Sequence, residues 1–213
     1  MLITNRLKEI NKKISSNLSL VAVSKTRNNK EILESYKSGQ LMFGENKVQE
    51  LTKKYEELPK NIQWHMIGHL QTNKVKYIAK FISLIHTVDS IKLMKEINKR
   101  AFNENRNIDC LIQIHIAKEK NKFGFKIHEI NDVLDLARDF KNINIKGLMG
   151  MGTYTDDLDI MNNEFKTLNC EFLKRKNFEF DTLSMGMSND YKIAIKNGST
   201  MIRLGSSIFG KRK

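Results

Sequence analysis

The sequence has few cysteines, the residues that stabilise small secreted domains through disulfides and small metal-bound domains through metal ligation. Its two cysteines, Cys110 and Cys170, lie 60 positions apart, with no CxxC motif and no partnering pair of histidines. This spacing argues against a disulfide framework, a zinc ribbon and a thioredoxin-like motif, and it favours a reducing compartment, the cytoplasm. No metal site is expected, because no histidine is paired with Cys or Asp at ligand spacing.

Proline, linkers and long apolar runs are also scarce. The chain has one proline and no apolar run of the roughly 18 residues that a membrane helix needs. Its first 14 residues mix Lys, Arg and Glu with isolated Leu and Ile, so they do not resemble a secretory signal. Across 213 residues, 40% hydrophobic and 29% charged, no shift in composition marks a boundary. The sequence therefore predicts one globular domain over 1–213 with no membrane partner.

Positive charge is present in excess, at a formal +13. The lysines are spread over most of the expected helices and alternate with Glu and Asn, rather than forming one stripe interleaved with aromatic residues. We interpret them as solvated helix faces and expect no nucleic-acid partner. A nucleic-acid surface is the alternative, and it would show itself as an affinity that falls with salt.

What the sequence does contain is a repeated alternation of apolar runs and helical spacing. The apolar runs cover 20–25, 41–46, 64–68, 83–88, 110–117, 145–150, 182–187 and 201–205. The segments with helical spacing cover 30–38, 48–58, 73–80, 91–105, 128–139, 158–176 and 190–197. Strands that alternate with helices predict a parallel sheet, and eight units predict a closed TIM-like (β/α)8 barrel. A doubly wound open sheet is the alternative.

The two ends of the chain fit this barrel in a particular way. The last apolar run is followed by too few residues for an eighth outer helix, so none is expected there. The helical stretch at 3–15 is expected to fill that gap.

In a barrel of this kind, chemistry belongs at the carboxyl ends of the strands. Lys25 directly follows the first apolar run. A lysine in that position can point into the barrel mouth, where partial desolvation frees its amine for Schiff-base chemistry. An ordinary strand-end lysine that reaches solvent is the alternative.

The segments after the seventh and eighth runs combine glycines, serines and expected helix starts. Gly186 and Gly205 allow a close backbone approach, and Ser188 and Ser206 supply hydroxyl donors. The loops after strands seven and eight form the recurrent phosphate site of this architecture, where helix N-termini favour an anion. The sequence therefore predicts a phosphate site here, with two routine turns as the alternative.

Several segments together resemble the pyridoxal phosphate homeostasis protein family, single-domain relatives of the N-terminal barrel of alanine racemase. The matching segments are AVSKT at 22–26, FGEN at 43–46 with VQE at 48–50, WHMIGHLQTNK at 64–74, GLM at 147–149, SMGMSND at 184–190 and RLGSSIFG at 203–210. They occur in family order from about residue 20 to the end. The resemblance implies a barrel of the alanine racemase N-terminal type without the C-terminal β domain.

The resemblance also implies a cofactor, pyridoxal 5′-phosphate (PLP), and the residues that bind it. Lys25 would carry PLP as an aldimine, Arg203 would contact the pyridine nitrogen, and Asn46 would lie near the ring. Phosphate contacts would come from Ser188, Gly205 and Ser206. The segment 115–124 matches a family Glu-x-x-Lys-x-Gly pattern, but its first residues depart from the usual Asn-rich lead, so we assign it no role.

These residues are suited to bind a cofactor rather than to catalyse a reaction. An arginine is always charged, so Arg203 near the pyridine nitrogen would disfavour its protonation and weaken the ring as an electron sink. Alanine racemase adds a second domain with a tyrosine acid/base, which this chain is expected to lack. We therefore expect no catalytic residues and a monomeric PLP-binding protein in intracellular PLP homeostasis, with apo-enzymes as possible recipients.

Two readings stay open. A PLP-dependent amino-acid racemase is the alternative function, and it needs a second acid or base. His65 and His69, near the third run, are candidates for that role. The competing reading is that these histidines are structural and satisfied by a neighbour.

Overall fold

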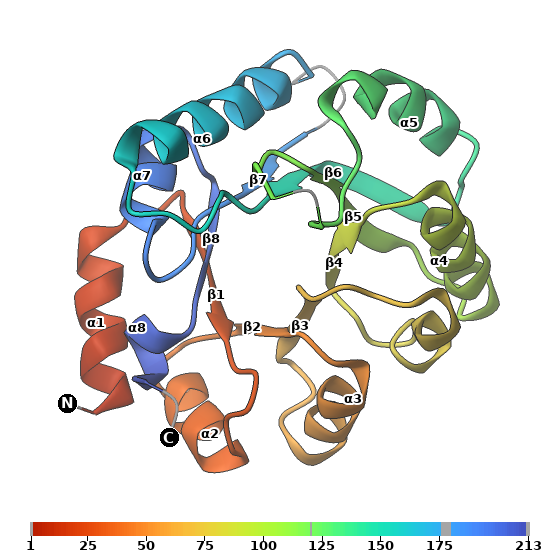
Figure 1. The fold of residues 1–213 in the computed structure, drawn as a ribbon. Helices are drawn as coiled ribbons and strands as arrows, with labels where there is room; N and C mark the ends of the chain where they lie inside the picture. The colour runs from red at the N-terminus through yellow and green to blue at the C-terminus, as the bar shows by residue number, and fades with distance from the viewer. Residues whose placement is uncertain (1, 120, 176–179, 212–213) are drawn as a thin grey trace.

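A computed structural model describes residues 2–119, 121–175 and 180–211, and its strands form a closed parallel barrel (Figure 1). The strands follow one another around the barrel in sequence order: β1 (Ser19–Val23), β2 (Met42–Glu45), β3 (Gln63–Met66), β4 (Leu84–Val88), β5 (Ile108–Ile114), β6 (Ile143–Gly150), β7 (Thr182–Ser184) and β8 (Met201–Leu204). β8 pairs with β1, which closes the ring. The predicted barrel is confirmed, and the open-sheet alternative is wrong.

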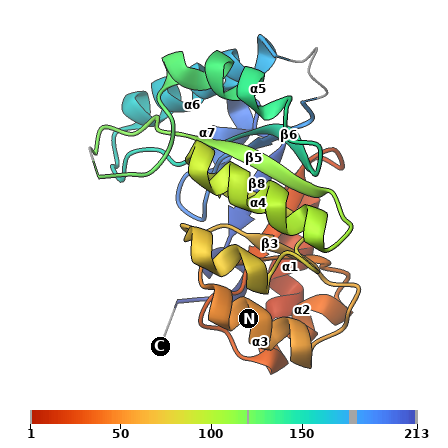
Figure 2. The same ribbon diagram turned by 90° about the vertical axis from the view of Figure 1, so that its right-hand side faces the viewer.

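Helices surround the strands, as the views along and across the barrel show (Figures 1 and 2). They are α1 (Ile3–Lys13), α2 (Asn29–Lys37), α3 (Val48–Glu57), α4 (Ile91–Asn103), α5 (Ile130–Ala137), α6 (Leu158–Leu173), α7 (Tyr191–Lys196) and α8 (Ser206–Phe209), with the 3₁₀ helices η1 (Thr72–Tyr77) and η2 (Ile127–Glu129). The helix predicted over 73–80 is therefore a 3₁₀ helix. Residue 176, the predicted end of another helix, lies outside the described residues.

The gap in the helical ring is filled largely as the sequence predicts. α1 packs against α2 and against α8, beside the junction of the first and last strands (Figure 1). The expectation that no helix follows the last strand was wrong, because the one-turn helix α8 begins directly after β8. Its Ile208 and Phe209 are buried, so this turn continues the core. Among the described residues, none of the helices has the length and apolar character to cross a membrane.

The alternation of side chains along each strand separates two apolar regions. Leu20 and Ala22 of β1 face outward and join the large core between strands and helices. Val21 faces the barrel interior, where it meets Leu111 and Met149 in a much smaller cluster. The barrel is thus filled by side chains rather than being a pore.

The interior also contains a buried polar chain, which runs from β8 across β7 and β4 to β3. Arg203 Nη1 donates to Ser184 Oγ (2.5 Å), and Ser184 Oγ lies 3.0 Å from Nδ1 of His86. Nε2 of His86 lies 3.0 Å from Nδ1 of His65. Because the guanidinium only donates, the Ser184 hydroxyl can donate to His86, and His86 can donate in turn to His65.

Burial keeps both of these imidazoles neutral. It lowers the pKa of His65 to about 4, and burial, with the neighbouring His65 and the charged Arg203, places the pKa of His86 well below its usual value. At a pH between the lowered pKa of each ring in the folded protein and its ordinary pKa in the unfolded chain, the folded protein binds fewer protons than the unfolded chain. The free energy of unfolding is therefore highest above the ordinary histidine pKa, and it falls as the pH falls through this window.

We expect the free energy of unfolding, measured with urea, to fall on acidification from about pH 7 to about pH 5, by about 2 kcal/mol for His65 alone. His65→Gln should reduce this loss, because the group that takes up a proton on unfolding is gone. His128→Gln, which removes an exposed ring on η2, is the matched control for the loss of one histidine. An unaltered pH dependence in His65→Gln would contradict the neutral burial of this pair.

Candidate functional site

One pocket of about 730 Å³ opens at the carboxyl ends of the strands. All six residues predicted from the sequence line it: Lys25, Asn46, Ser188, Arg203, Gly205 and Ser206. They come from the loops after β1, β2 and β7, from β8, and from the start of α8 with the glycine before it. The structure therefore brings residues from both ends of the chain to one cavity, as the closed barrel requires.

Lys25 lies two positions beyond β1, where the strand pattern still governs the direction of the backbone. The N–H of Ser24 donates to the carbonyl of Gly44 (3.0 Å), which extends the β1–β2 ladder by one residue. With Val21 facing the interior, the alternation turns Ser24 outward and Lys25 toward the barrel mouth. Thr26 then has a left-handed backbone, with φ of 65°, so the chain bends sharply just after the lysine. Lys25 thus stands at the pocket wall rather than on the outer surface.

The loops after β7 and β8 are joined into one cradle by a serine hydroxyl. Ser188 Oγ accepts hydrogen bonds from the N–H groups of Gly205 (3.2 Å) and Ser207 (3.4 Å). The loop reaches this position through Gly186, which has φ of 98° and whose missing Cβ would lie 2.7 Å from the Cβ of Ala194. Because the Ser188 oxygen accepts these two bonds, its own proton can be donated to a ligand oxygen in the pocket.

Arg203 contributes the positive charge of the pocket. Its residue is only 3% exposed, and its second guanidinium nitrogen donates to the carbonyl of Gly150 (3.2 Å). Burial lowers the pKa of Arg203 to about 10, against the opposing effect of the Asp190 carboxylate, so the group stays charged at neutral pH. Burial also raises the pKa of Asp190. The chain of Ser184, His86 and His65 lies behind Arg203 and fixes its direction.

Asn46 follows β2 and is held by a close backbone contact. A Cβ at Gly68 would lie 2.5 Å from the carbonyl oxygen of Asn46, so only glycine fits at that position. The hydroxyl of Thr87 donates to the carbonyl of Gly68 (2.7 Å), which fixes the glycine in turn. The loops after β2 and β3 and the end of β4 therefore support one another at the edge of the pocket.

The histidines singled out in the sequence lie outside the pocket lining. His65 is buried and satisfied by His86, which is the structural reading of this residue. His69 Nδ1 lies 2.9 Å from Asp89 Oδ2, and its ring stacks on Phe123 with centroids 3.8 Å apart. Over the described ranges, nowhere do three or more His, Cys, Asp or Glu side chains gather so as to hold a metal ion.

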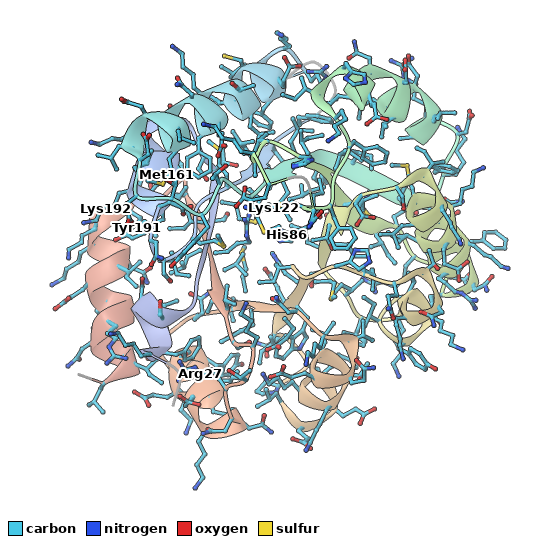
Figure 3. The ribbon with its side chains drawn as sticks, in the orientation of Figure 1. Arg27, His86, Lys122, Met161, Tyr191 and Lys192 are labelled. Atoms are coloured by element: carbon cyan, nitrogen blue, oxygen red, sulfur yellow. The ribbon has the colours of Figure 1, made fainter. Side chains whose placement is uncertain are left out.

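The sequence reasoning missed the residues that close the other side of the pocket. Lys122 lines it and donates to the carbonyl of Gly152 (2.8 Å), with an ion pair to Glu119 (2.8 Å). Figure 3 shows Lys122 and His86 near the middle of the barrel, whereas Arg27 lies beside α2. The Glu-x-x-Lys-x-Gly pattern at 119–124 was the available signal. The segment 151–156 after β6 also lines the pocket, with Tyr154 88% exposed at its rim.

Comparison with known proteins places this chain among relatives that match it almost end to end. The family model described as "Alanine racemase, N-terminal domain" matches residues 2–213. The pyridoxal phosphate homeostasis protein of Aquifex aeolicus is 38% identical over 198 residues, which are 91% of this chain and 87% of that protein. The protein of the same name from Schizosaccharomyces pombe is 39% identical over 201 residues, which are 92% of this chain and 85% of that protein.

Solved structures of similar proteins have the same barrel fold. PipY from Synechococcus elongatus, with PLP bound, superposes with a TM-score of 0.89 at 29% identity and covers 98% of this chain and 100% of its own. The same protein without PLP gives a TM-score of 0.91 at 30% identity. Alanine racemase from Clostridium difficile, at 12% identity, shares the fold with a TM-score of 0.83, and the match covers 57% of its chain. This chain belongs to the alanine racemase N-terminal domain family and, within it, to the pyridoxal phosphate homeostasis proteins.

Proposed function

We propose that this protein binds PLP reversibly through Lys25 and takes part in controlling the free pool of this aldehyde. The observation that carries the proposal is that Lys25 shares one pocket with the Ser188–Gly205–Ser206 cradle and with Arg203. The relatives' names and the PLP-bound neighbour support the choice of cofactor.

The residues of the pocket fit the chemistry of PLP. The cofactor carries an aldehyde, an anionic phosphate and a pyridine nitrogen. An amine, a hydroxyl-rich loop pair and a guanidinium stand in one pocket of about 730 Å³, a volume within the usual range of small-molecule sites. Ser188 joins the two loops of the cradle and keeps a proton to donate to the phosphate. We assign the phosphate contacts to Ser188, Gly205 and Ser206, and we place Asn46 near the ring.

The proposed binding step needs no other reactant. The Lys25 amine adds to the aldehyde carbon, a carbon–nitrogen double bond forms, and one water molecule leaves. Release is the exchange of one amine for another: an incoming primary amine adds to the same carbon, its two N–H protons pass to the Lys25 nitrogen, and Lys25 leaves as a free amine. Water reverses the first step in the same way. A lysine in an apo-enzyme is one such incoming amine, so we propose apo-enzymes as recipients.

We propose that binding is not followed by catalysis. PLP supplies an electron sink when it is bound, and that sink is strongest with a protonated pyridine nitrogen. Arg203 stays charged and is held by Ser184 and Gly150, so it opposes a second positive charge on the ring. The nearby His65 is buried and has a pKa of about 4, which makes it a poor proton donor to the pocket.

The setting that we propose for this activity is the cytoplasm, with the protein acting as a monomer of one domain over 1–213. Cys110 and Cys170 are unpaired thiols, as a reducing compartment favours. The positive charge is spread over the helices, so we propose no nucleic-acid partner.

The first prediction concerns the modified residue. Wild-type protein mixed with PLP should show an imine absorption band, and borohydride reduction should fix the cofactor on the peptide that contains Lys25. Lys25→Ala should lose both the band and the labelled peptide. Lys122→Ala, which removes the other lysine of the pocket, should keep them. Mass spectrometry that finds an unchanged label in Lys25→Ala would overturn the assignment.

The second prediction separates the phosphate cradle from the lysine. Ser188→Ala should weaken PLP binding about tenfold, because a hydrogen bond to a charged group is lost. The same change should leave binding of pyridoxal, which has no phosphate, nearly unaltered. Ser207→Ala is the matched control, since Ser207 meets the cradle through its backbone N–H. Equal losses for PLP and pyridoxal in Ser188→Ala would argue against a phosphate contact.

The third prediction addresses the racemase alternative. We expect no exchange of the α-proton for deuterium when the PLP-loaded protein is incubated with a panel of amino acids in heavy water and followed by NMR. Exchange that disappears in Lys25→Ala would instead favour the racemase reading.

A further inference from the structure

A buried ion cluster lies behind Lys25, between the outer side of the barrel wall and α3. At its centre, Lys54 Nζ contacts Glu50 Oε1 (2.6 Å), Glu45 Oε1 (2.8 Å) and the carbonyl of Ser24 (2.8 Å). The side chain of Lys54 is 6% exposed and that of Glu45 is fully buried. We call Lys54, Glu45 and Glu50 the Lys54 cluster; the function proposed above does not use it.

The Lys54 cluster holds the backbone on both sides of Lys25. Before the lysine, Ser24 Oγ donates to Glu45 Oε1 (2.6 Å) while the Ser24 carbonyl accepts from Lys54. After it, the N–H of Thr26 donates to Glu50 Oε1 (2.6 Å). The two residues that flank Lys25 are therefore tied to the same three charged side chains, and Lys25 lies between two fixed points.

The backbone at this point needs such support. Thr26 is β-branched and has φ of 65°, a conformation that is unfavourable for its side chain and persists only where the surroundings fix it. This bend ends the strand just after Lys25. Without the contact from Glu50, the segment could relax to an extended conformation, and the lysine would turn with it. The contacts thus fix which way the amine points.

Stability alone does not explain the Lys54 cluster. Replacing a buried ion pair with well-packed apolar side chains is often neutral or stabilising, because desolvation of the charges opposes their attraction. Glu45 also has its second carboxylate oxygen, Oε2, buried with no hydrogen-bond partner among the described residues. Burial of this oxygen adds to the desolvation cost of the Lys54 cluster, so a gain in stability does not account for it.

We propose that Lys54, with Glu45 and Glu50, is the positioning group of Lys25: it holds Ser24 and Thr26 so that the amine faces the cradle, and its hold depends on the charge of Glu45. This inference rests on the proposed function, because it concerns how well Lys25 meets the PLP aldehyde. Positioning of this kind changes the rate and the affinity of bond formation without touching the cofactor.

The charge of Glu45 can change near neutral pH. Burial raises the pKa of Glu45 to about 7, against the lowering effects of Lys54 and of the Ser24 hydroxyl, while the charge of Glu50 raises it further. Lys54 and Glu50 face it from α3 and Ser24 from the end of β1, whereas its register neighbour on β3 is the apolar Met66. Below this pKa the carboxyl gains a proton and its attraction for Lys54 weakens.

The test measures how fast and how tightly the full-length protein forms the imine band with PLP, across the neutral pH range. Lys54→Met should slow band formation and weaken PLP binding about tenfold or more, since the charge-assisted contact with the Ser24 carbonyl is lost and Glu45 and Glu50 lose the cation between them. Lys54→Arg keeps the charge and should restore most of both. The wild-type rate should decline as the pH falls through about 7, and Glu45→Gln should remove that inflection.

A matched control separates positioning from loss of stability. Arg175 forms a comparable buried ion pair with Glu171 (2.6 Å), beyond the far end of α6 from the pocket-lining Leu158. Arg175→Met should lower the melting temperature as Lys54→Met does, yet leave the rate, the affinity and the pH profile of PLP binding unchanged. If Lys54→Met does not fold, Glu50→Ala decides instead, because the Glu50 side chain is 24% exposed and its loss frees only Thr26 and one contact of Lys54.

The outcomes are distinct. Wild-type rates and pH profiles in both Lys54→Met and Glu50→Ala, or an inflection that persists in Glu45→Gln, would overturn the positioning role while leaving Lys25 as the attachment site. Wild-type protein that forms no reducible bond at Lys25 would instead overturn the proposed function itself. Slow binding in Lys54→Met that Lys54→Arg does not rescue would also count against the role of the charge.

Discussion

The ladder between β1 and β8 is the constraint on which the site depends. Its register pairs Val21 with Arg203 and Ala22 with Leu204, so the end of the first strand and the end of the last are side by side. The Cβ that Gly205 lacks would lie 3.5 Å from the Val23 side chain, which continues the same alignment beyond the paired residues. Because the ladder is parallel, both strands deliver their following loops to the same edge. Lys25 and the cradle meet there, although about 180 residues separate them along the chain.

The same alternation of side chains that makes the barrel core divides the charged groups between two environments. On β8, Ile202 and Leu204 pack outward, which turns Arg203 into the interior beneath the pocket. At the end of β1, Ser24 turns outward to Lys54 and Lys25 turns into the mouth. A slip of one residue in either strand would exchange these faces and bury the lysine against α3. The site therefore needs the strand register as much as it needs the residue types.

The sequence predicted the eight strands well because each is a short apolar run bounded by polar or glycine-containing segments. Lys25, Ser188, Arg203 and Gly205 could be placed at the carboxyl edge from their positions in those runs, without knowledge of the contacts. The one-turn helix α8 was missed because four residues carry too little periodicity to be read as a helix.

Other features could not be read from the sequence because they depend on pairs of residues from different units. The sequence around His86 does not predict its contact with Ser184, which lies 98 positions away. The sequence around Lys54 likewise does not predict its contact with a carbonyl 30 positions before it. Lys122 belongs to the Glu-x-x-Lys-x-Gly pattern at 119–124, but the pattern does not show that the lysine meets the Gly152 carbonyl, 30 positions away, in the pocket.

Buried charge is arranged differently on the two sides of the cofactor pocket, and the difference has a physical reason. Arg203 donates to neutral partners, the Ser184 hydroxyl and the Gly150 carbonyl, and the acidic group that acts on its charge is Asp190, in the pocket lining. Behind Lys25, by contrast, two carboxylates surround Lys54. An uncompensated cation beside Lys25 would repel a protonated amine and its imine, whereas a cation already paired with carboxylates can hold the backbone without adding a net positive field. One side of the pocket thus presents charge to the ligand, and the other uses charge to set the direction of the lysine.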